Sequence, residues 1–281
     1  MLTCLINGVP ADEISVGERA LQYGDGLFET IVVRQGQAEF IDRHIQRLQA
    51  GCERLALDFT DWSSLRTEVG ALSASYPDTV IKIILGRGPG ERGYRSTPGQ
   101  PVTRIIGAYA LPEWLDEYAK TGIRVRVCET RLAIQPRLAG IKHLNRLEQV
   151  LARAEWQDEF QEGLLLDYNG RLVEATMSNL FLVRNGVIVT PKLQDCGVAG
   201  VMRSVIIDLA EQSGIPCSVD DVGTDALDNG TGMFVCNSLV GIWPVTEIEG
   251  REPLEVDSTT RELQTMLNRC SKTQPGEWRP F

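Results

Sequence analysis

Lysine is the scarce basic residue of this chain, so any lysine chemistry can be traced to a few positions. The five lysines are Lys82, Lys120, Lys142, Lys192 and Lys272. An amine attacks an aldehyde only in its neutral form, which burial or a neighbouring cation favours by lowering the lysine pKa. Lys142 follows the apolar segment Leu138–Ile141, and Lys82 interrupts the apolar run Val80–Leu85. Either could be such a nucleophile or a side chain that extends to solvent, and the pattern leaves both open.

A glycine in front of a predicted helix is a candidate anion site. Gly200 precedes a helical pattern that begins at Val201, and the unpaired backbone N–H groups of a helix start bind anions well. Glycine is also an ordinary turn residue there, so this signal alone is weak. The chain has neither a G-x-x-x-x-G-K-[ST] loop nor a strand followed by G-x-G-x-x-G. Their absence argues against a nucleoside triphosphatase and a dinucleotide enzyme.

Glu174 is the acidic candidate, in the segment Gly170-Arg-Leu-Val-Glu-Ala-Thr-Met-Ser-Asn179. A carboxylate beside a pyridine nitrogen keeps that nitrogen protonated, and a pyridinium ring can take up electrons. On the pattern alone, a solvated glutamate explains this position equally well.

The composition is that of a folded protein and excludes several classes of partner. Hydrophobic residues make up 43% and charged residues 23% of the chain, as in globular enzymes. A formal net charge of -10 argues against binding to nucleic acid or to an anionic membrane surface. The seven cysteines lie far apart, without C-x-x-C pairs or histidines at ligand spacing, so we expect reduced thiols and no metal site. With no signal-peptide pattern and no stretch of about 18 apolar residues, a cytoplasmic location is expected.

Strand-like runs alternate with helical patterns in the first half of the chain. Apolar residues at three- and four-residue spacing predict a helix over residues 41–55, and a second helix is expected over 62–72. Strands are expected at 27–34, 38–40, 79–85 and 102–111. The segment Gly86–Gly99 has five glycines and three arginines, which indicates an exposed, irregular loop able to contact an anion.

The second half repeats this alternation. A helix carrying Leu144, Leu147, Val150 and Leu151 is expected to begin at or just after Lys142. Further helices are expected at 201–213 and 259–269, with strands at 123–129, 164–167, 179–183, from 233 and near 245. We therefore expect a mixed α+β fold with an N-terminal α/β domain over 1–111, a connection over 112–122 and a C-terminal α/β domain over 123–281.

Six segments in order along the chain resemble motifs of the fold type IV pyridoxal phosphate enzymes. They are Tyr23–Thr30, Arg47 in His44–Leu48, Lys142, Glu174 with Asn179, Gly200–Arg203, and Cys236–Ser238. The resemblance extends over nearly the whole chain. It implies a two-domain fold like that of D-amino-acid aminotransferases, with pyridoxal 5'-phosphate between the domains and bound mostly by the C-terminal one. It also implies a homodimer acting on a small molecule.

The resemblance further implies a role for each site residue. Lys142 stands where the family lysine forms the Schiff base with the cofactor, and Thr30 is the candidate to assist proton delivery. The implied cofactor contacts are Arg47 and Ser238 at the phosphate, Glu174 at the pyridine nitrogen, Asn179, Lys142, and the amides of Val201 and Met202. The implied substrate contacts are Thr30, Arg92, Tyr94 and Asn237.

Within that family, Ala139–Leu151 and Arg87–Tyr94 resemble the aminodeoxychorismate lyases. This resemblance implies conversion of 4-amino-4-deoxychorismate to 4-aminobenzoate and pyruvate, on the route to folate. The Arg-x-His element of D-amino-acid aminotransferases and the Tyr-x-Arg-Pro of branched-chain aminotransferases are both missing. The alternatives are an aminotransferase of the same fold, acting on D-amino or branched-chain amino acids, and a non-catalytic small-molecule binding protein that retains the fold.

Overall fold

The structure is a computed structural model that describes residues 1–112, 115–228, 232–270, 272–273 and 276–280. Its chain forms two compact units. Unit one comprises Met1–Pro112, Ile141–Asn145 and Lys272–Glu277, and unit two comprises Glu113–Gly140, Arg146–Ser271 and Trp278–Phe281. The segment with Lys142 therefore belongs to unit one, although its neighbours in the chain on both sides belong to unit two. Of the predicted connection over 112–122, residues 113–114 lie outside the described residues.

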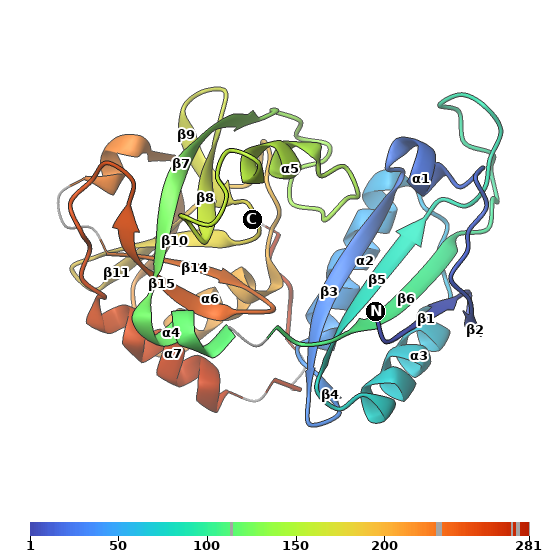
Figure 1. The fold of residues 1–281 in the computed structure, drawn as a ribbon, viewed down its shortest axis with the longest axis horizontal. Helices are drawn as coiled ribbons and strands as arrows, with labels where there is room; N and C mark the ends of the chain where they lie inside the picture. The colour runs from blue at the N-terminus through green and yellow to red at the C-terminus, as the bar shows by residue number, and fades with distance from the viewer. Residues whose placement is uncertain (113–114, 229–231, 271, 274–275, 281) are drawn as a thin grey trace. The chain divides into compact units, whose positions relative to one another are not determined.

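Unit one is built on a six-stranded antiparallel sheet (Figure 1). Its strands, in spatial order, are β2 (Val9–Pro10), β1 (Thr3–Ile6), β6 (Thr103–Tyr109), β5 (Thr79–Gly86), β3 (Gly26–Arg34) and β4 (Gln37–Ala38). Its helices are α1 (Arg19–Tyr23), α2 (Ile41–Leu55) and α3 (Trp62–Ser75). The predicted helix over 41–55 is confirmed, and its apolar residues Ile45, Leu48 and Cys52 are buried.

The two faces of this sheet differ in burial. Side chains alternate along a strand, so odd-numbered residues of β3 share one face and even-numbered residues the other. Leu27, Ile31 and Val33 are at most 1% exposed, on the face that α2 covers. Phe28 and Thr30, on the opposite face, are only half-buried. We call this second face the open face of unit one.

Residues Ile141–Asn145 extend the sheet beside the first residues of β3. Phe28 N donates to the carbonyl of Lys142 at 2.9 Å, and Leu144 N donates to the carbonyl of Gly26 at 3.0 Å. The next helix, α5 (Leu147–Arg153), begins five residues after Lys142, so the predicted position of Lys142 at a helix entrance is wrong. The apolar spacing predicted too early a start for this helix, because Leu144 packs against Gly26 of β3 and does not lie on a helix face.

Unit two is built on a nine-stranded mixed sheet. Its strands, in spatial order, are β12 (Cys217–Asp220), β11 (Val187–Pro191), β10 (Asn179–Arg184), β14 (Gly232–Asn237), β15 (Gly241–Ile248), β7 (Ile123–Leu132), β8 (Glu162–Asp167), β9 (Arg171–Ala175) and β13 (Val222–Gly223). The pairs β11–β12, β15–β7 and β7–β8 are parallel, and the others are antiparallel. A tight turn, Thr176–Ser178, joins β9 to β10, which are far apart in this order, so the sheet must curl.

The other helices of unit two are α4 (Leu115–Thr121), α6 (Val201–Gln212), α7 (Ser258–Arg269) and the short 3-10 helix η1 (Thr224–Leu227). The predicted helices over 201–213 and 259–269 are confirmed to within one residue at each end. The mixed helix and sheet content confirms the predicted α+β fold class. In the part of the chain that the structure describes, no helix is both long and apolar enough to cross a membrane.

Candidate active site

The open face of unit one brings Lys142 and Thr30 onto one surface. The Lys142 Nζ lies 4.4 Å from the centroid of the Phe28 ring. Lys82 stands directly opposite Thr30 in the β3–β5 register, and its Nζ lies 5.5 Å from the same ring. Both candidate lysines therefore flank Phe28, and geometry alone does not decide between them.

Arg47, expected at the cofactor phosphate, belongs to a buried charged cluster in unit one. Its Nε donates to Glu29 Oε1 at 2.7 Å and its Nη2 to the other oxygen of that carboxylate, while the His44 Nδ1 lies 2.6 Å from Glu29 Oε2. Burial by itself raises the pKa of Glu29, but the charge of Arg47 and the hydrogen bonds from Arg47 and His44 outweigh it and lower this pKa to about 2. Burial lowers the pKa of His44, so a neutral imidazole donates its Nδ1–H to Glu29.

The sequence analysis missed Glu29 and His44 as site residues, although both stand in the motifs that it quoted. Glu29 and Arg47 are 18 positions apart. The signal that points to Glu29 is its place in an otherwise apolar run on β3, since a charge inside such a run requires a partner.

Arg92 and Tyr94 lie on the Gly86–Gly99 loop, which is irregular as predicted. Both side chains are exposed, Tyr94 by 88%, whereas Thr30 and Lys142 are half-buried. The loop is held by Arg19, which donates to the carbonyls of Gly93 at 2.8 Å and Tyr94 at 3.0 Å. Their predicted role at the substrate stays a prediction.

In unit two, Glu174 and Asn179 form hydrogen bonds with the backbone of the residues just before α6. Glu174 is 4% exposed, and its Oε2 accepts a hydrogen bond from Val198 N at 2.7 Å. Asn179 Nδ2 donates to the carbonyl of Val198 at 2.8 Å, and Asn179 Oδ1 accepts from Gly200 N at 3.0 Å. A side chain at Gly200 has no space, because a Cβ there would lie 2.0 Å from Asn179 Oδ1.

The start of α6 has a backbone arrangement that could bind an anion. Gly200 is the N-cap and supplies no side-chain hydrogen bond to the first turn, which begins with Val201 and Met202. The first backbone N–H groups of a helix lack partners within the helix and carry partial positive charge. This arrangement suits a phosphate group.

Asn237 and Ser238 lie at the end of β14, in the turn that follows it. Asn237 Nδ2 donates to Ser178 Oγ at 3.1 Å and to the carbonyl of Met177 at 3.3 Å. Its Oδ1 accepts from Leu239 N at 2.8 Å and Val240 N at 2.9 Å. The Asn237 amide therefore joins the β9–β10 turn to its own turn.

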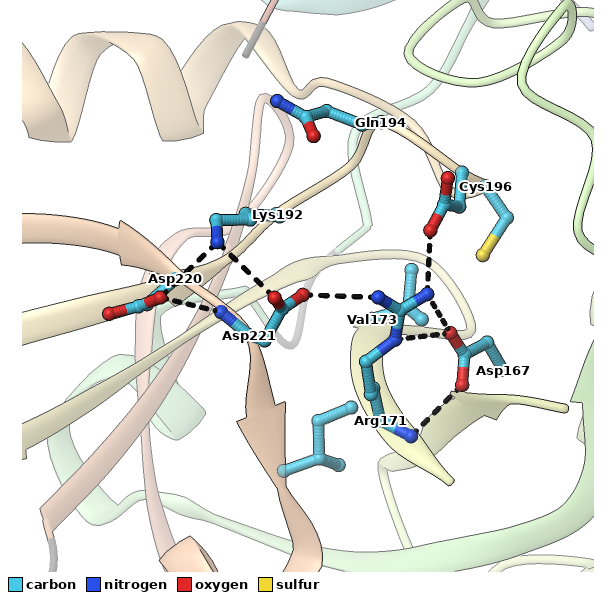
Figure 2. A pocket seen from close by; sticks show the side chains of 10 residues that line it. Asp167, Arg171, Val173, Lys192, Gln194, Cys196, Asp220 and Asp221 are labelled. Atoms are coloured by element: carbon cyan, nitrogen blue, oxygen red, sulfur yellow. Dashed lines mark hydrogen bonds and ion pairs between the residues drawn. The ribbon is translucent and has the colours of Figure 1, made fainter. Parts of the chain in front are cut away.

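A cavity of about 90 Å³ in unit two has none of these residues in its lining (Figure 2). Arg171 of β9 crosses it and binds the carboxylates of Asp167 at 2.8 Å, Asp195 at 2.6 Å and Asp221 at 3.2 Å. Arg171 precedes Glu174 by three residues, and Asp195 precedes Val198 by three. The network therefore fastens the loop in front of α6 to the strand that carries Glu174.

Comparison with known proteins assigns the chain to a family. The family model described as Amino-transferase class IV matches residues 26–248. The chain belongs to this family. That match confirms the resemblance to fold type IV enzymes, and the matched range contains every predicted site residue from Thr30 to Ser238.

Individual relatives cover almost the whole chain. The chain is similar to an aminodeoxychorismate lyase from Vibrio harveyi, with 38% identity over 94% of this chain and 98% of that protein. Its structure resembles a crystal structure of 4-amino-4-deoxychorismate lyase from Pseudomonas aeruginosa, with a TM-score of 0.90, 46% identity, and coverage of 94% and 98%. A putative branched-chain-amino-acid aminotransferase from Methanocaldococcus jannaschii is 32% identical over 92% of this chain and 93% of that protein.

The buried cluster around Glu29 yields a prediction about acid stability. Replacing Glu29 by Gln leaves Arg47 buried without its counter-charge, so we expect a loss of about 3 kcal/mol in the free energy of unfolding at neutral pH. The Glu29 carboxylate has a pKa of about 2 in the folded protein and 4.5 in the unfolded chain. It therefore stabilises the fold fully at pH values above 4.5, and this contribution is lost as the pH falls toward 2. Urea unfolding from about pH 6 to pH 3 is therefore expected to give a difference between parent and variant that shrinks with acidity.

Glu91→Gln, on the exposed loop, is the matched control and is expected to change the unfolding free energy little at any pH. A difference between parent and Glu29→Gln that stays constant over this pH range contradicts the prediction.

Proposed function

We propose that the chain is a pyridoxal 5'-phosphate-dependent carbon–oxygen lyase that converts 4-amino-4-deoxychorismate to 4-aminobenzoate and pyruvate, a step in folate biosynthesis. The observation that carries the proposal is the similarity to the P. aeruginosa lyase, at 46% identity with a TM-score of 0.90. The V. harveyi lyase supports it at 38% identity over 94% of the chain. An aminotransferase is the second candidate because of the 32% identity to the M. jannaschii protein.

The residues present suit the cofactor. Glu174 provides a buried carboxylate for the pyridine nitrogen, and the amides of Val201 and Met202 at the start of α6 suit its phosphate. Lys142, against the Phe28 ring, is the lysine that holds the aldehyde carbon. Arg47, Asn179 and Ser238 complete the proposed cofactor set. When bound, the cofactor supplies a conjugated ring that takes up an electron pair.

The chain's own residues move protons and hold charge in this proposal. Once the substrate amine has taken its place on the cofactor, Lys142 would be a free amine and would remove the proton from the ring carbon that bears the substrate amine. Thr30, on the same open face, would assist proton delivery. The carbon–oxygen bond to the enolpyruvyl group then breaks, and this group gains a proton and leaves as pyruvate. The six-membered ring becomes aromatic, which makes the elimination strongly downhill. Arg92, Tyr94 and Asn237 are the proposed substrate contacts, and a planar guanidinium suits a carboxylate.

One assay tests the reaction and separates the two candidates. The purified protein, loaded with cofactor and supplied with aminodeoxychorismate, is expected to release 4-aminobenzoate and pyruvate in equal amounts without any keto acid. Turnover that requires a keto-acid acceptor contradicts the lyase and supports the aminotransferase.

We predict that Lys142, not Lys82, carries the cofactor. Borohydride reduction followed by peptide mass mapping is expected to find the pyridoxyl adduct on the peptide that contains Lys142. Lys82→Ala, which removes the other amine beside Phe28, is the matched control and keeps the adduct. An adduct on the peptide that contains Lys82 overturns the assignment. So does loss of the adduct in the Lys82→Ala variant.

Glu174→Gln is expected to keep the cofactor but lose most of the elimination rate. The phosphate contacts at Val201 and Met202 remain, whereas the neutral amide no longer stabilises a protonated pyridine nitrogen. Loss of one preorganised charge typically costs roughly 10²–10³ in kcat. A variant that absorbance shows to be fully loaded, yet turns over near the parent rate, refutes this role for Glu174.

The apolar face of α5 supports a homodimer. Leu147, Val150 and Leu151 fall at helical spacing and are exposed by 75%, 60% and 61%. Such a contiguous exposed stripe is typical of an interface, and a second copy of the chain is the partner that the family resemblance implies. A cytoplasmic location belongs to the same proposal, and it is supported by the seven cysteines, none of which forms a disulfide within the described residues, as in a reducing compartment.

Leu151→Arg is expected to shift the protein from dimer to monomer, because it buries an unpaired charge in the proposed interface. Light scattering at micromolar concentration measures the mass. Val187→Arg, at an exposed apolar site elsewhere in unit two, is the control and keeps the dimer. A monomeric parent protein, or a dimeric Leu151→Arg variant, contradicts the prediction.

A further inference from the structure

Glu162, the first residue of β8, is a fully buried carboxylate with an unusual set of partners. Its exposed fraction is 0%, yet within the described ranges no lysine or arginine pairs with it. Ser178 Oγ donates to Glu162 Oε1 at 2.7 Å, Thr176 Oγ1 donates to Oε2, and Met177 N lies 3.3 Å from both oxygens. Burial raises the pKa of Glu162, which these donors partly offset. Burying a carboxylate without a cation is costly, so its surroundings must be built to hold it.

The three donors make up the whole turn between β9 and β10. This turn follows Glu174 by two residues and directly precedes Asn179, the two side chains that hold the segment in front of α6. Its backbone is also fixed, because Ala175 N donates to the carbonyl of Ser178 at 2.7 Å and Thr176 N to the carbonyl of Gly163 at 3.0 Å. Glu162 therefore anchors both ends of a turn that separates two site residues.

The hydrogen bonds continue from this turn to the end of β14. A hydroxyl has one hydrogen, and Ser178 gives it to Glu162, so its oxygen is left to accept from Asn237 Nδ2 at 3.1 Å. The Asn237 Oδ1 then faces Leu239 N and Val240 N. Backbone N–H groups can only donate, so the bonds from Leu239 N and Val240 N fix which end of the Asn237 amide faces Ser178, and the turn that is held at the far end contains Ser238.

We propose that Glu162 is a positioning residue of the cofactor site, which acts through Ser178 and Asn237 to set the turn that presents Ser238 to the phosphate. The inference rests on the proposed function, since Ser238 is a phosphate contact only if pyridoxal 5'-phosphate binds. Glu162 itself contacts neither cofactor nor substrate in this proposal.

The test compares the binding of pyridoxal 5'-phosphate and of phosphate-free pyridoxal to the apoprotein, measured by absorbance titration. Glu162→Gln keeps the size of the side chain but replaces one acceptor oxygen with a donor, so one of the two hydroxyls, of Ser178 or of Thr176, loses its acceptor. We expect pyridoxal 5'-phosphate affinity to fall about tenfold, the size of coupling typical of residues in one network, with pyridoxal affinity unchanged. Glu247→Gln, at an exposed carboxylate of unit two, is the control and changes neither affinity.

Ser178→Ala breaks the same series of hydrogen bonds at the next residue and leaves Glu162 its other donors. It therefore provides the test if Glu162→Gln does not fold. Ser178→Ala is expected to give the same selective loss of pyridoxal 5'-phosphate affinity, whereas Ser178→Thr, which keeps the hydroxyl, is expected to retain it. The double variant of Glu162→Gln and Ser178→Ala is expected to bind no more weakly than either single variant. Equal losses for both ligands, or additive losses, would indicate a general structural role and overturn the proposal. Unchanged affinities in both variants also overturn it. A parent protein that binds neither ligand refutes the proposed function instead.

Discussion

The hydrogen bonds on the three residues before α6 are the constraint on which the unit-two half of the site depends. Glu174 holds the N–H of Val198, and Asn179 spans from the Val198 carbonyl to the N–H of Gly200. Because a helix continues the direction of its first residues, these bonds set where the amides of Val201 and Met202 point. The Arg171 network and the Glu162 cluster hold the strands that carry Glu174 and Asn179.

Among the buried carboxylates, Glu29, Glu162, Asp167 and Glu174 are each stabilised differently. Glu29 is neutralised mainly by the cation of Arg47, which lowers its pKa, whereas Glu162 has hydroxyl and amide donors without a cation, and burial raises its pKa. Asp167 pairs with a partly exposed arginine, and Glu174 accepts a backbone N–H. A buried glutamate thus forms an ion pair with Arg47 in unit one, but a series of hydrogen bonds through Ser178 in unit two, because the neighbouring residues differ.

Local patterns in the sequence predicted the parts of the fold that depend on local order. The helical spacing from Ile41 to Leu55 matched α2 to the residue, and the α6 start at Val201 followed from Gly200. The same spacing placed the start of the next helix too early, because Leu144, which it counted as helical, pairs with β3, more than a hundred positions earlier. Leu147, Val150 and Leu151 do lie on α5, as predicted. Periodicity carries no information about such distant partners.

The site shows the same limit. Motif resemblance indicated Glu174, Asn179 and Arg47, but not the carboxylates that position them. Glu162 contacts a turn fourteen to sixteen residues later, and Glu29 contacts Arg47 across a strand–helix connection. In the sequence, Glu162 is an ordinary charged residue beside an apolar run, and the place of Glu29 inside such a run shows that it needs a partner but not which one. Only the burial that the fold imposes turns them into structural anchors.

The backbone on either side of Lys142 is held by hydrogen bonds within each unit. Two residues earlier, Gly140 donates to the carbonyl of Gly197 at 2.9 Å and accepts from Ala199 N at 3.0 Å. The carbonyl of Lys142 itself is fixed to Phe28. A main chain secured so close to the amine has little freedom to travel during a catalytic cycle. Relative to the β3 strand, the Nζ therefore moves mainly by rotation about the bonds of its own side chain, beside the Phe28 ring at 4.4 Å.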